Sequence, residues 1–308
     1  MEFENKIEFV LNRIKGLHST FDSVITDYRK AIAEYEQHNP GDFYTSPPEY
    51  WVLVIRCDAL VKLRIFLERN FTYIETLSLL ATTRYVFELS VWLRAIKLDK
   101  NYAIYYVHKL VDGAEEHSKQ LYEQLIHEVS LLKSFQRKDD DLTNQCLEKL
   151  KHEHASPEEM DKATRRISET IDAEAAIRFS LYGEEAVSNG YGLQVHLIES
   201  KAIPRAKFEL EEAQKSKEQF NDKWNSLLSN IDKKWEWKKM AKNVGMEDEH
   251  NYIYSYTSRL LHAKPSSLTT NQKSLESPEV YVFLRYCFVK ITEMLEDGTE
   301  QLSKPKMH

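Results

Sequence analysis

The chain has 308 residues, 42% of them hydrophobic, so it is long enough to bury a sizeable core and, on length alone, to form about two domains. Glycine and proline are scarce, at eight each, and alternating runs rich in Val and Thr are absent, which favours helices. The formal net charge of −7 excludes the overall basic character of many nucleic-acid-binding proteins, so such a function would need a local basic patch.

The cysteines and the N-terminus indicate the compartment. Cys57, Cys146 and Cys287 lie far apart, which excludes a disulfide framework and a zinc motif and favours a reducing environment. The charged N-terminus is unlike a signal peptide, and no apolar run approaches the roughly 18 residues that a membrane helix needs. We therefore expect a cytoplasmic protein with no membrane partner, no metal and no cofactor.

The N-terminal segment predicts one long helix that ends near Asn39. Its large apolar residues recur at alternating steps of four and three, the spacing of a heptad seam. They are Phe3, Ile7, Val10, Ile14, Leu17, Phe21, Val24, Tyr28, Ala31 and Tyr35. Such a seam needs a long partner surface, so we expect it to pack within a helical bundle and also to support a homodimer.

Capping signals predict the helices that follow. They cover about 48–69, 72–98, 101–136, a short stretch to 153 and 156–182. The charged run 138–141 is expected to end the helix over 101–136 and to separate it from the short helix that follows. Ser156 and Glu159 form one of these predicted capping boxes. Further helices are expected over about 205–230, 233–244, 248–263 and 278–298.

The middle of the chain is rich in charge and poor in large apolar residues. Residues 112–182 therefore predict a protruding charged helical hairpin rather than a second core. Three glycines, Gly183, Gly190 and Gly192, predict an irregular loop over 183–204. We interpret residues 1–308 as a single all-α domain, a helical bundle with a long N-terminal helix and this hairpin.

Two charged residues lie in the otherwise apolar helix over 72–98. Arg84 and Glu88 are four residues apart, so they share one helical face. They either form an ion pair on a wet face or point inward, where the pair must meet polar groups of another helix.

The tyrosine-rich segment 252–265 carries a second candidate group. Ser258, Arg259 and His262 lie within about one helical turn. Imidazole can act as a general acid or base near neutral pH, and guanidinium can bind a phosphate bidentately. The alternative for His262 is a structural one, a cap that donates to a carbonyl. No Gly-x-Ser-x-Gly motif surrounds Ser258, which excludes a serine hydrolase of that type.

One stretch combines basic and aromatic residues, with five lysines against one glutamate over 233–242. Its candidate RNA-binding residues are Lys233, Lys234, Trp235, Trp237, Lys238, Lys239 and Lys242. Lysines beside indoles could hold phosphates while bases stack. The alternative is an amphipathic helix that buries its tryptophans and leaves its lysines in water.

These motifs resemble an uncharacterised all-helical family of bacterial proteins. Its members carry a helix with Arg and Glu, matched here by Arg84 and Glu88. Later in the chain they carry a tyrosine-rich Ser-x-x-x-His-x-x-Pro-like segment, matched here by Ser258, His262, Pro265 and Ser266. The resemblance spans roughly 50–110 and 230–265.

More distantly, the chain resembles the HEPN superfamily, helical bundles that are often dimeric and include many metal-independent RNases of toxin–antitoxin and anti-phage systems. The HEPN signature places four to six residues between Arg and His, whereas Arg259 and His262 are separated by two. The resemblance implies an RNase or RNA-binding effector with catalytic residues Arg84, Glu88, Ser258, Arg259 and His262. A non-enzymatic interaction or regulatory subunit, with a protein partner, is the alternative.

Overall fold

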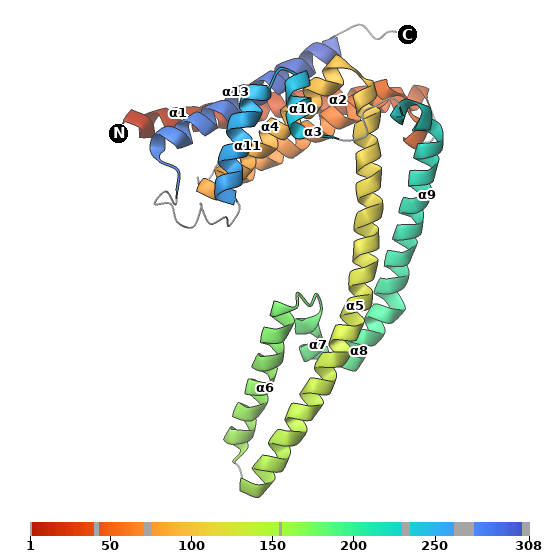
Figure 1. The fold of residues 1–308 in the computed structure, drawn as a ribbon, viewed down its shortest axis with the longest axis vertical. Helices are drawn as coiled ribbons and strands as arrows, with labels where there is room; N and C mark the ends of the chain where they lie inside the picture. Colours follow the sequence, from red (N-terminus) through yellow and green to blue (C-terminus); the bar gives the residue numbers. More distant parts are fainter. Residues whose placement is uncertain are drawn as a thin grey trace. The chain divides into compact units, whose positions relative to one another are not determined.

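The computed structural model describes residues 2–39, 43–70, 75–153, 156–229, 235–261 and 274–303. These ranges are helical apart from short connections and contain no strand, which confirms the predicted all-α fold (Figure 1). The chain divides into two compact units, Met1–His108 with Phe220–His308 and, between them in sequence, Lys109–Gln219, where we had predicted a single domain. None of the described helices combines the length and the apolar character needed to cross a membrane.

The heptad seam forms the predicted long N-terminal helix, with one interruption. Helix α1 (Glu2–Gly16) and helix α2 (His18–His38) meet at Leu17, whose backbone stays in the right-handed helical region at φ −73° and ψ −12°. None of the ten seam residues is exposed, and five are fully buried: Val10, Ile14, Phe21, Val24 and Tyr28. The seam therefore packs within its own unit, and the homodimer stays a prediction.

The first unit is a helical bundle that places α11 against α4. Its other described helices are η1 (Phe43–Thr45), α3 (Pro48–Asn70), α4 (Thr76–Leu98), α10 (Trp237–Asn243), α11 (Glu247–Leu261) and α13 (Ser277–Ser303). Helix α2 packs on α3, while α13 lies between α1 and α4 as a partner of both (Figure 1). Helix α11 packs on the same α4, which is apolar enough to be covered by several helices.

Helix α13 passes Gly298, where we had expected it to end. Gly298 is buried against Tyr28, and a Cβ built on it would lie 3.4 Å from the Tyr28 Cε2 atom. The Tyr28 hydroxyl donates to the Gly298 carbonyl at 3.1 Å. This glycine therefore permits close helix packing instead of ending the helix.

Tyr28 should make the stability of this unit sensitive to alkaline pH. Burial is the main cause that raises the pKa of Tyr28 to about 12, although Arg56 nearby opposes it. The folded state thus holds this proton more tightly than the unfolded state, so the contribution to stability is complete below pH 10 and is lost as the pH rises from about 10 to 12. In urea titrations, we expect wild type to lose up to about 3 kcal/mol more than Tyr28→Phe across this interval.

The stability difference at pH 8 between wild type and Tyr28→Phe serves as the reference, because it measures the loss of the hydroxyl and its hydrogen bonds to Gly298 and Gln301 without the titration. Parallel stability curves from pH 8 to 12 would contradict the assignment.

The second unit contains one helix that is longer than predicted. Helix α5 (Asn101–Glu153) starts in the first unit and continues through the run 138–141, where we had expected a break. A run of charged residues can remain helical when oppositely charged side chains pair with it. Here Lys138 pairs with Glu174 of α6 (Pro157–Ile177). The capping box at the start of α6 is confirmed, since the Glu159 amide donates to the Ser156 hydroxyl and the Ser156 amide donates to the Glu159 carboxylate.

The structure corrects the predicted irregular loop over 183–204. The segment forms α7 (Gly183–Asn189), α8 (Tyr191–Leu197) and a π-helical turn (Ile198–Ala202) that leads into α9 (Ile203–Leu228). The glycines serve close packing and chain reversal. A Cβ on Gly183 would lie 3.0 Å from the Ala175 Cβ, and Gly190 adopts φ +92° between α7 and α8.

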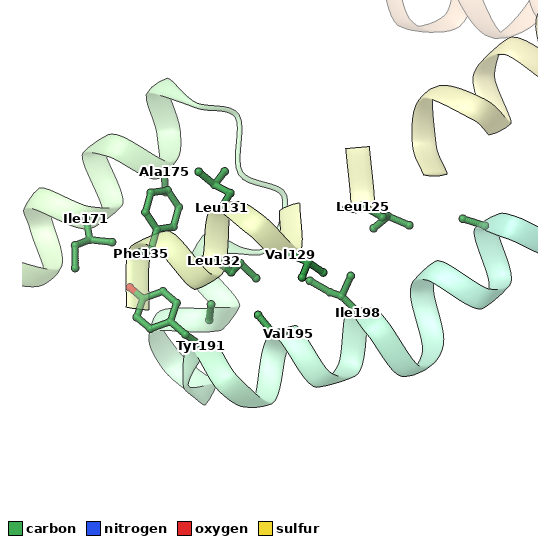
Figure 2. Packing of buried hydrophobic residues seen from close by; sticks show 12 residues of the cluster. Leu125, Val129, Leu131, Leu132, Phe135, Ile171, Ala175, Tyr191, Val195 and Ile198 are labelled. Atoms are coloured by element: carbon green, nitrogen blue, oxygen red, sulfur yellow. The ribbon is translucent and has the colours of Figure 1, made fainter. Parts of the chain in front are cut away.

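These helices bury a core of their own, contrary to the prediction of a charged hairpin without one. Figure 2 shows α5 contributing Leu132 and Phe135, which lie toward Ile171 and Ala175 of α6 and toward Tyr191 and Val195 of α8. The buried cluster comprises Leu125, Val129, Leu131, Leu132, Phe135, Ile171, Ala175, Ala186, Tyr191, Val195, Ile198 and Ala206. Residues 183–206 contribute Ala186, Tyr191, Val195, Ile198 and Ala206 to this core, so it is larger than residues 112–182 alone would provide.

Candidate functional site

Arg84 and Glu88 meet α11 at the α4–α11 contact. The Arg84 Nε donates to Glu88 Oε1 at 3.0 Å, and only 29% and 26% of the two side chains are exposed. The hydroxyl of Tyr254 on α11 donates to the same Glu88 oxygen at 2.7 Å. This geometry agrees with the inward-facing alternative, in which the pair meets a polar group of another helix.

Tyr254 is the centre of this cluster. The Arg84 guanidinium carbon lies 4.4 Å from the centroid of the Tyr254 ring, a cation–π contact. The same ring stacks on His250 with centroids 4.6 Å apart and meets the edge of Phe87 at 5.9 Å. Arg84 is therefore attached to Tyr254 both directly, through the ring, and indirectly, through Glu88.

The surroundings raise the pKa values of two members of this cluster, Tyr254 and Arg84. Burial, and then the hydrogen bond to Glu88, raise the pKa of Tyr254 well above its ordinary range, so the phenol stays neutral at physiological pH. Burial disfavours the Arg84 cation, but its interactions with Glu88 and Tyr254 outweigh this and raise the Arg84 pKa. The cluster thus holds one cation, and Tyr254 cannot act as a base near neutral pH.

The candidate residues of the tyrosine-rich segment are placed only in part. Ser258 and Arg259 belong to α11, but their side chains lie outside the described part of the structure, as does the whole of His262. Ser258 follows Tyr254 by four residues, which is about 6 Å along a helix axis. The structure therefore brings Arg84 and Glu88 to the helix that carries Ser258 and Arg259, while their approach to His262 stays a prediction.

Tyr254 and His250 were missed by the sequence reasoning. Residues 250, 254 and 258 recur at steps of four, so they share one face of α11, and this spacing is visible in the sequence. What the sequence lacks is the identity of the partner helix. Without it, Tyr254 is one of 17 tyrosines with no reason to be singled out.

Contacts with α13 hold α11 in place. Lys290, almost fully buried, pairs with Glu249 at 3.4 Å and with Glu293 at 3.1 Å. Glu293 in turn accepts a hydrogen bond from Arg94 of α4 at 2.9 Å. Tyr256 also donates to Glu279 at the start of α13. This alternating series of charges links three helices and sets the position of α11 relative to α4.

In the basic-aromatic stretch 233–242, the two tryptophans pack against protein, as in the alternative of an amphipathic helix that buries its indoles. Trp235 stacks face to face on Trp92 of α4, with ring centroids 3.5 Å apart and an interplanar angle of 10°, and Trp237 meets the edge of Trp235 at 5.4 Å. At least one face of the Trp235 indole is thus covered by protein.

The lysines of this stretch have a different environment from its tryptophans. Lys238, Lys239 and Lys242 are exposed on α10, where they can meet a polyanion, while Lys233 and Lys234 lie outside the described residues. The buried residues of α10 are Met240 and Ala241. A basic surface is therefore retained on α10, but the stacking role expected for Trp235 is reduced.

The described part of the site is a cation, a carboxylate and a neutral phenol held between two helices. Such a group can present a guanidinium to an anion such as a phosphate, with the carboxylate already engaged by two donors. A scan against protein-family models, a search of curated proteins and a search of solved structures each found no match to this chain.

Proposed function

We propose that this protein is a HEPN-like, metal-independent RNase or RNA-binding effector that acts in toxin systems or anti-phage defence. The observation that supports this function is the Arg84–Glu88 pair, which meets Tyr254 on α11, the helix that also carries Ser258 and Arg259. Two motifs about 170 residues apart in sequence (258 − 88 = 170) thus belong to neighbouring helices.

The proposed chemistry uses the nucleophile that RNA itself contains. His262 takes the proton of the ribose 2′-hydroxyl as its oxygen attacks the adjacent phosphorus, or returns a proton to the leaving 5′-oxygen as the phosphorus–oxygen bond breaks. Arg259 holds the scissile phosphate, with Arg84 assisting, because guanidinium matches the geometry of phosphate oxygens. Glu88 fixes Arg84. The products are a 2′,3′-cyclic phosphate and a 5′-hydroxyl.

The test is cleavage by the purified full-length chain. Single-stranded RNA, a structured hairpin RNA and transfer RNA are incubated with the protein in excess chelator, and the new ends are mapped chemically. Cleavage that persists in chelator and leaves 2′,3′-cyclic phosphate ends supports the RNase. Binding without cleavage favours the RNA-binding effector, and neither binding nor cleavage on all three RNAs overturns the proposal.

The lysines of α10 should contribute to RNA affinity. We expect Lys238→Glu combined with Lys239→Glu to weaken RNA binding and to reduce the magnitude of the slope of log K against log salt by about 1 to 2. Each phosphate contact releases counterions when the complex forms, so a variant with fewer contacts releases fewer of them. Fluorescence anisotropy across 50–300 mM salt measures both effects.

The matched control for the α10 lysines is Lys149→Glu with Lys151→Glu on α5, which are also exposed and make the same change in net charge. If both pairs weaken binding equally, the effect comes from overall charge and α10 is not part of the RNA interface.

A non-enzymatic helical interaction or regulatory subunit is the second candidate. The observation that favours it is an exposed apolar group at the C-terminal end of α6, where Ile177 is 80% and Phe179, two residues later, is 83% exposed. Phe179 also holds a positive φ of 54°, an unusual conformation for a bulky residue. This candidate is preferred when the wild type neither binds nor cleaves RNA.

A further inference from the structure

We propose that Tyr254 is a positioning residue that holds the Arg84 guanidinium in the orientation needed to contact a phosphate of RNA. The inference rests on the proposed function and assigns a role to a residue outside the motifs that suggested that function. It concerns how the site is preorganised, and Tyr254 itself need not touch the substrate.

Two contacts from Tyr254 define where Arg84 lies. The ring is 4.4 Å from the guanidinium carbon, and the hydroxyl donates to Glu88 Oε1, the atom that also accepts the Arg84 Nε–H. A cation–π contact sets the height of a guanidinium over a ring but leaves it free to rotate in plane. The bond from Nε to Glu88 restricts this rotation, so the two contacts together specify one orientation.

The orientation leaves the useful donors of Arg84 for a ligand. A guanidinium has five N–H donors, and the bond to Glu88 engages the Nε–H, so the Nη edge is the part that can bind two phosphate oxygens at once. The Arg84 side chain is 29% exposed, so part of it is in contact with solvent. Glu88 accepts from both Arg84 and Tyr254 on one oxygen, and this lowers its repulsion toward an incoming phosphate.

Tyr254 is itself held in place, as a positioning residue must be. His250 stacks on it at 4.6 Å, Phe87 contacts its ring edge-on, and Trp237 lies at 6.4 Å. The helix that carries it is anchored by the Lys290–Glu249 pair. A guanidinium fixed by such a support does not have to be oriented at the moment of reaction, which favours the transition state over the ground state.

Two substitutions separate the contacts of Tyr254. Tyr254→Phe removes the donor to Glu88 and keeps the ring under Arg84, whereas Tyr254→Leu removes both. We expect kcat for RNA cleavage to fall about tenfold in the first and about a hundredfold in the second, with KM changed by less than about threefold. Tyr252→Phe, a half-exposed tyrosine on the same helix, is the control and should keep the wild-type kcat.

A double-mutant cycle distinguishes positioning from general support of the fold. If Tyr254 acts through Arg84, Tyr254→Phe should have no further effect on kcat in an Arg84→Ala background. Full additivity of the two losses, in variants shown to be folded by circular dichroism, overturns the proposal.

A readout without RNA separates this inference from the proposed function. In nuclear magnetic resonance spectra of the full-length protein, the Arg84 Nε–H should exchange slowly with solvent in wild type and at least tenfold faster in Tyr254→Leu. If wild type does not cleave RNA but this dependence holds, the positioning of Arg84 stands and the RNase function is lost. If exchange is unaffected by Tyr254→Leu, the positioning proposal is overturned whether or not RNA is cleaved.

Discussion

Replacing Glu128 by alanine should lower the free energy of unfolding of the Lys109–Gln219 unit by about 3–5 kcal/mol, the size expected when three neutral donors lose a shared acceptor at about 1–3 kcal/mol each and some of them reach water instead. Glu128 lies on α5 and is only 1% exposed. Its carboxylate accepts hydrogen bonds from the Ser180 hydroxyl at 2.5 Å and from the Leu181 and Tyr182 amides at 3.1 Å each.

The size of this effect follows from where the three donors lie. They belong to the connection between α6 and α7, where the chain reverses after Phe179 at a positive φ. Without the carboxylate, two part-buried backbone amides and a hydroxyl would lose this acceptor. The connection would then loosen, and α7 would lose its fixed position against the core of the unit.

Urea unfolding followed by circular dichroism measures the loss, and amide hydrogen exchange locates it. Glu123→Ala, an exposed position on the same helix, is the matched control and should change stability by less than about 0.5 kcal/mol. Glu128→Gln should be intermediate, because one oxygen can still accept. Equal stabilities for the Glu128 and Glu123 variants would show that the connection between α6 and α7 does not depend on this carboxylate.

The parts of the fold that the sequence predicted are those set by local spacing. The heptad seam specified which residues of α1 and α2 face the bundle, because apolar residues that recur every 3.5 positions lie along one side of a helix. The capping box of Ser156 and Glu159 specified a helix start, since its hydrogen bonds connect residues three apart. Both are properties of a few neighbouring residues and need no knowledge of the rest of the chain.

The parts that could not be predicted depend on partners distant in sequence. The run 138–141 resembles a break until Glu174 of α6 is present to pair with Lys138. Gly183 resembles a loop residue until Ala175 is seen to lie too close for a side chain. In the same way, Tyr254 gains its significance from Arg84 and Glu88, which lie more than 160 residues earlier (254 − 88 = 166).

His262→Ala should reduce RNA cleavage by about two to four orders of magnitude, the usual contribution of a general acid or base. In wild type the reaction should persist in chelator and show a bell-shaped dependence on pH, since one group must accept a proton and another must donate one. Single-turnover rates at saturating protein isolate the chemical step, and affinity for RNA should change little, because imidazole contributes less to phosphate binding than the lysines of α10.

His117→Ala is the control for His262→Ala, because His117 is an exposed histidine in the other unit and its loss should leave cleavage unchanged. If His262 is instead a helix cap, its replacement should lower stability by about 1 kcal/mol and leave the cleavage rate of the remaining folded protein at the wild-type value. Wild type and His262→Ala, both folded, would then give the same background on all three RNAs. That result would leave Arg84, Glu88 and Tyr254 as a structural network between α4 and α11, and it would favour a protein-interaction role for the exposed apolar residues at the end of α6, Ile177 and Phe179.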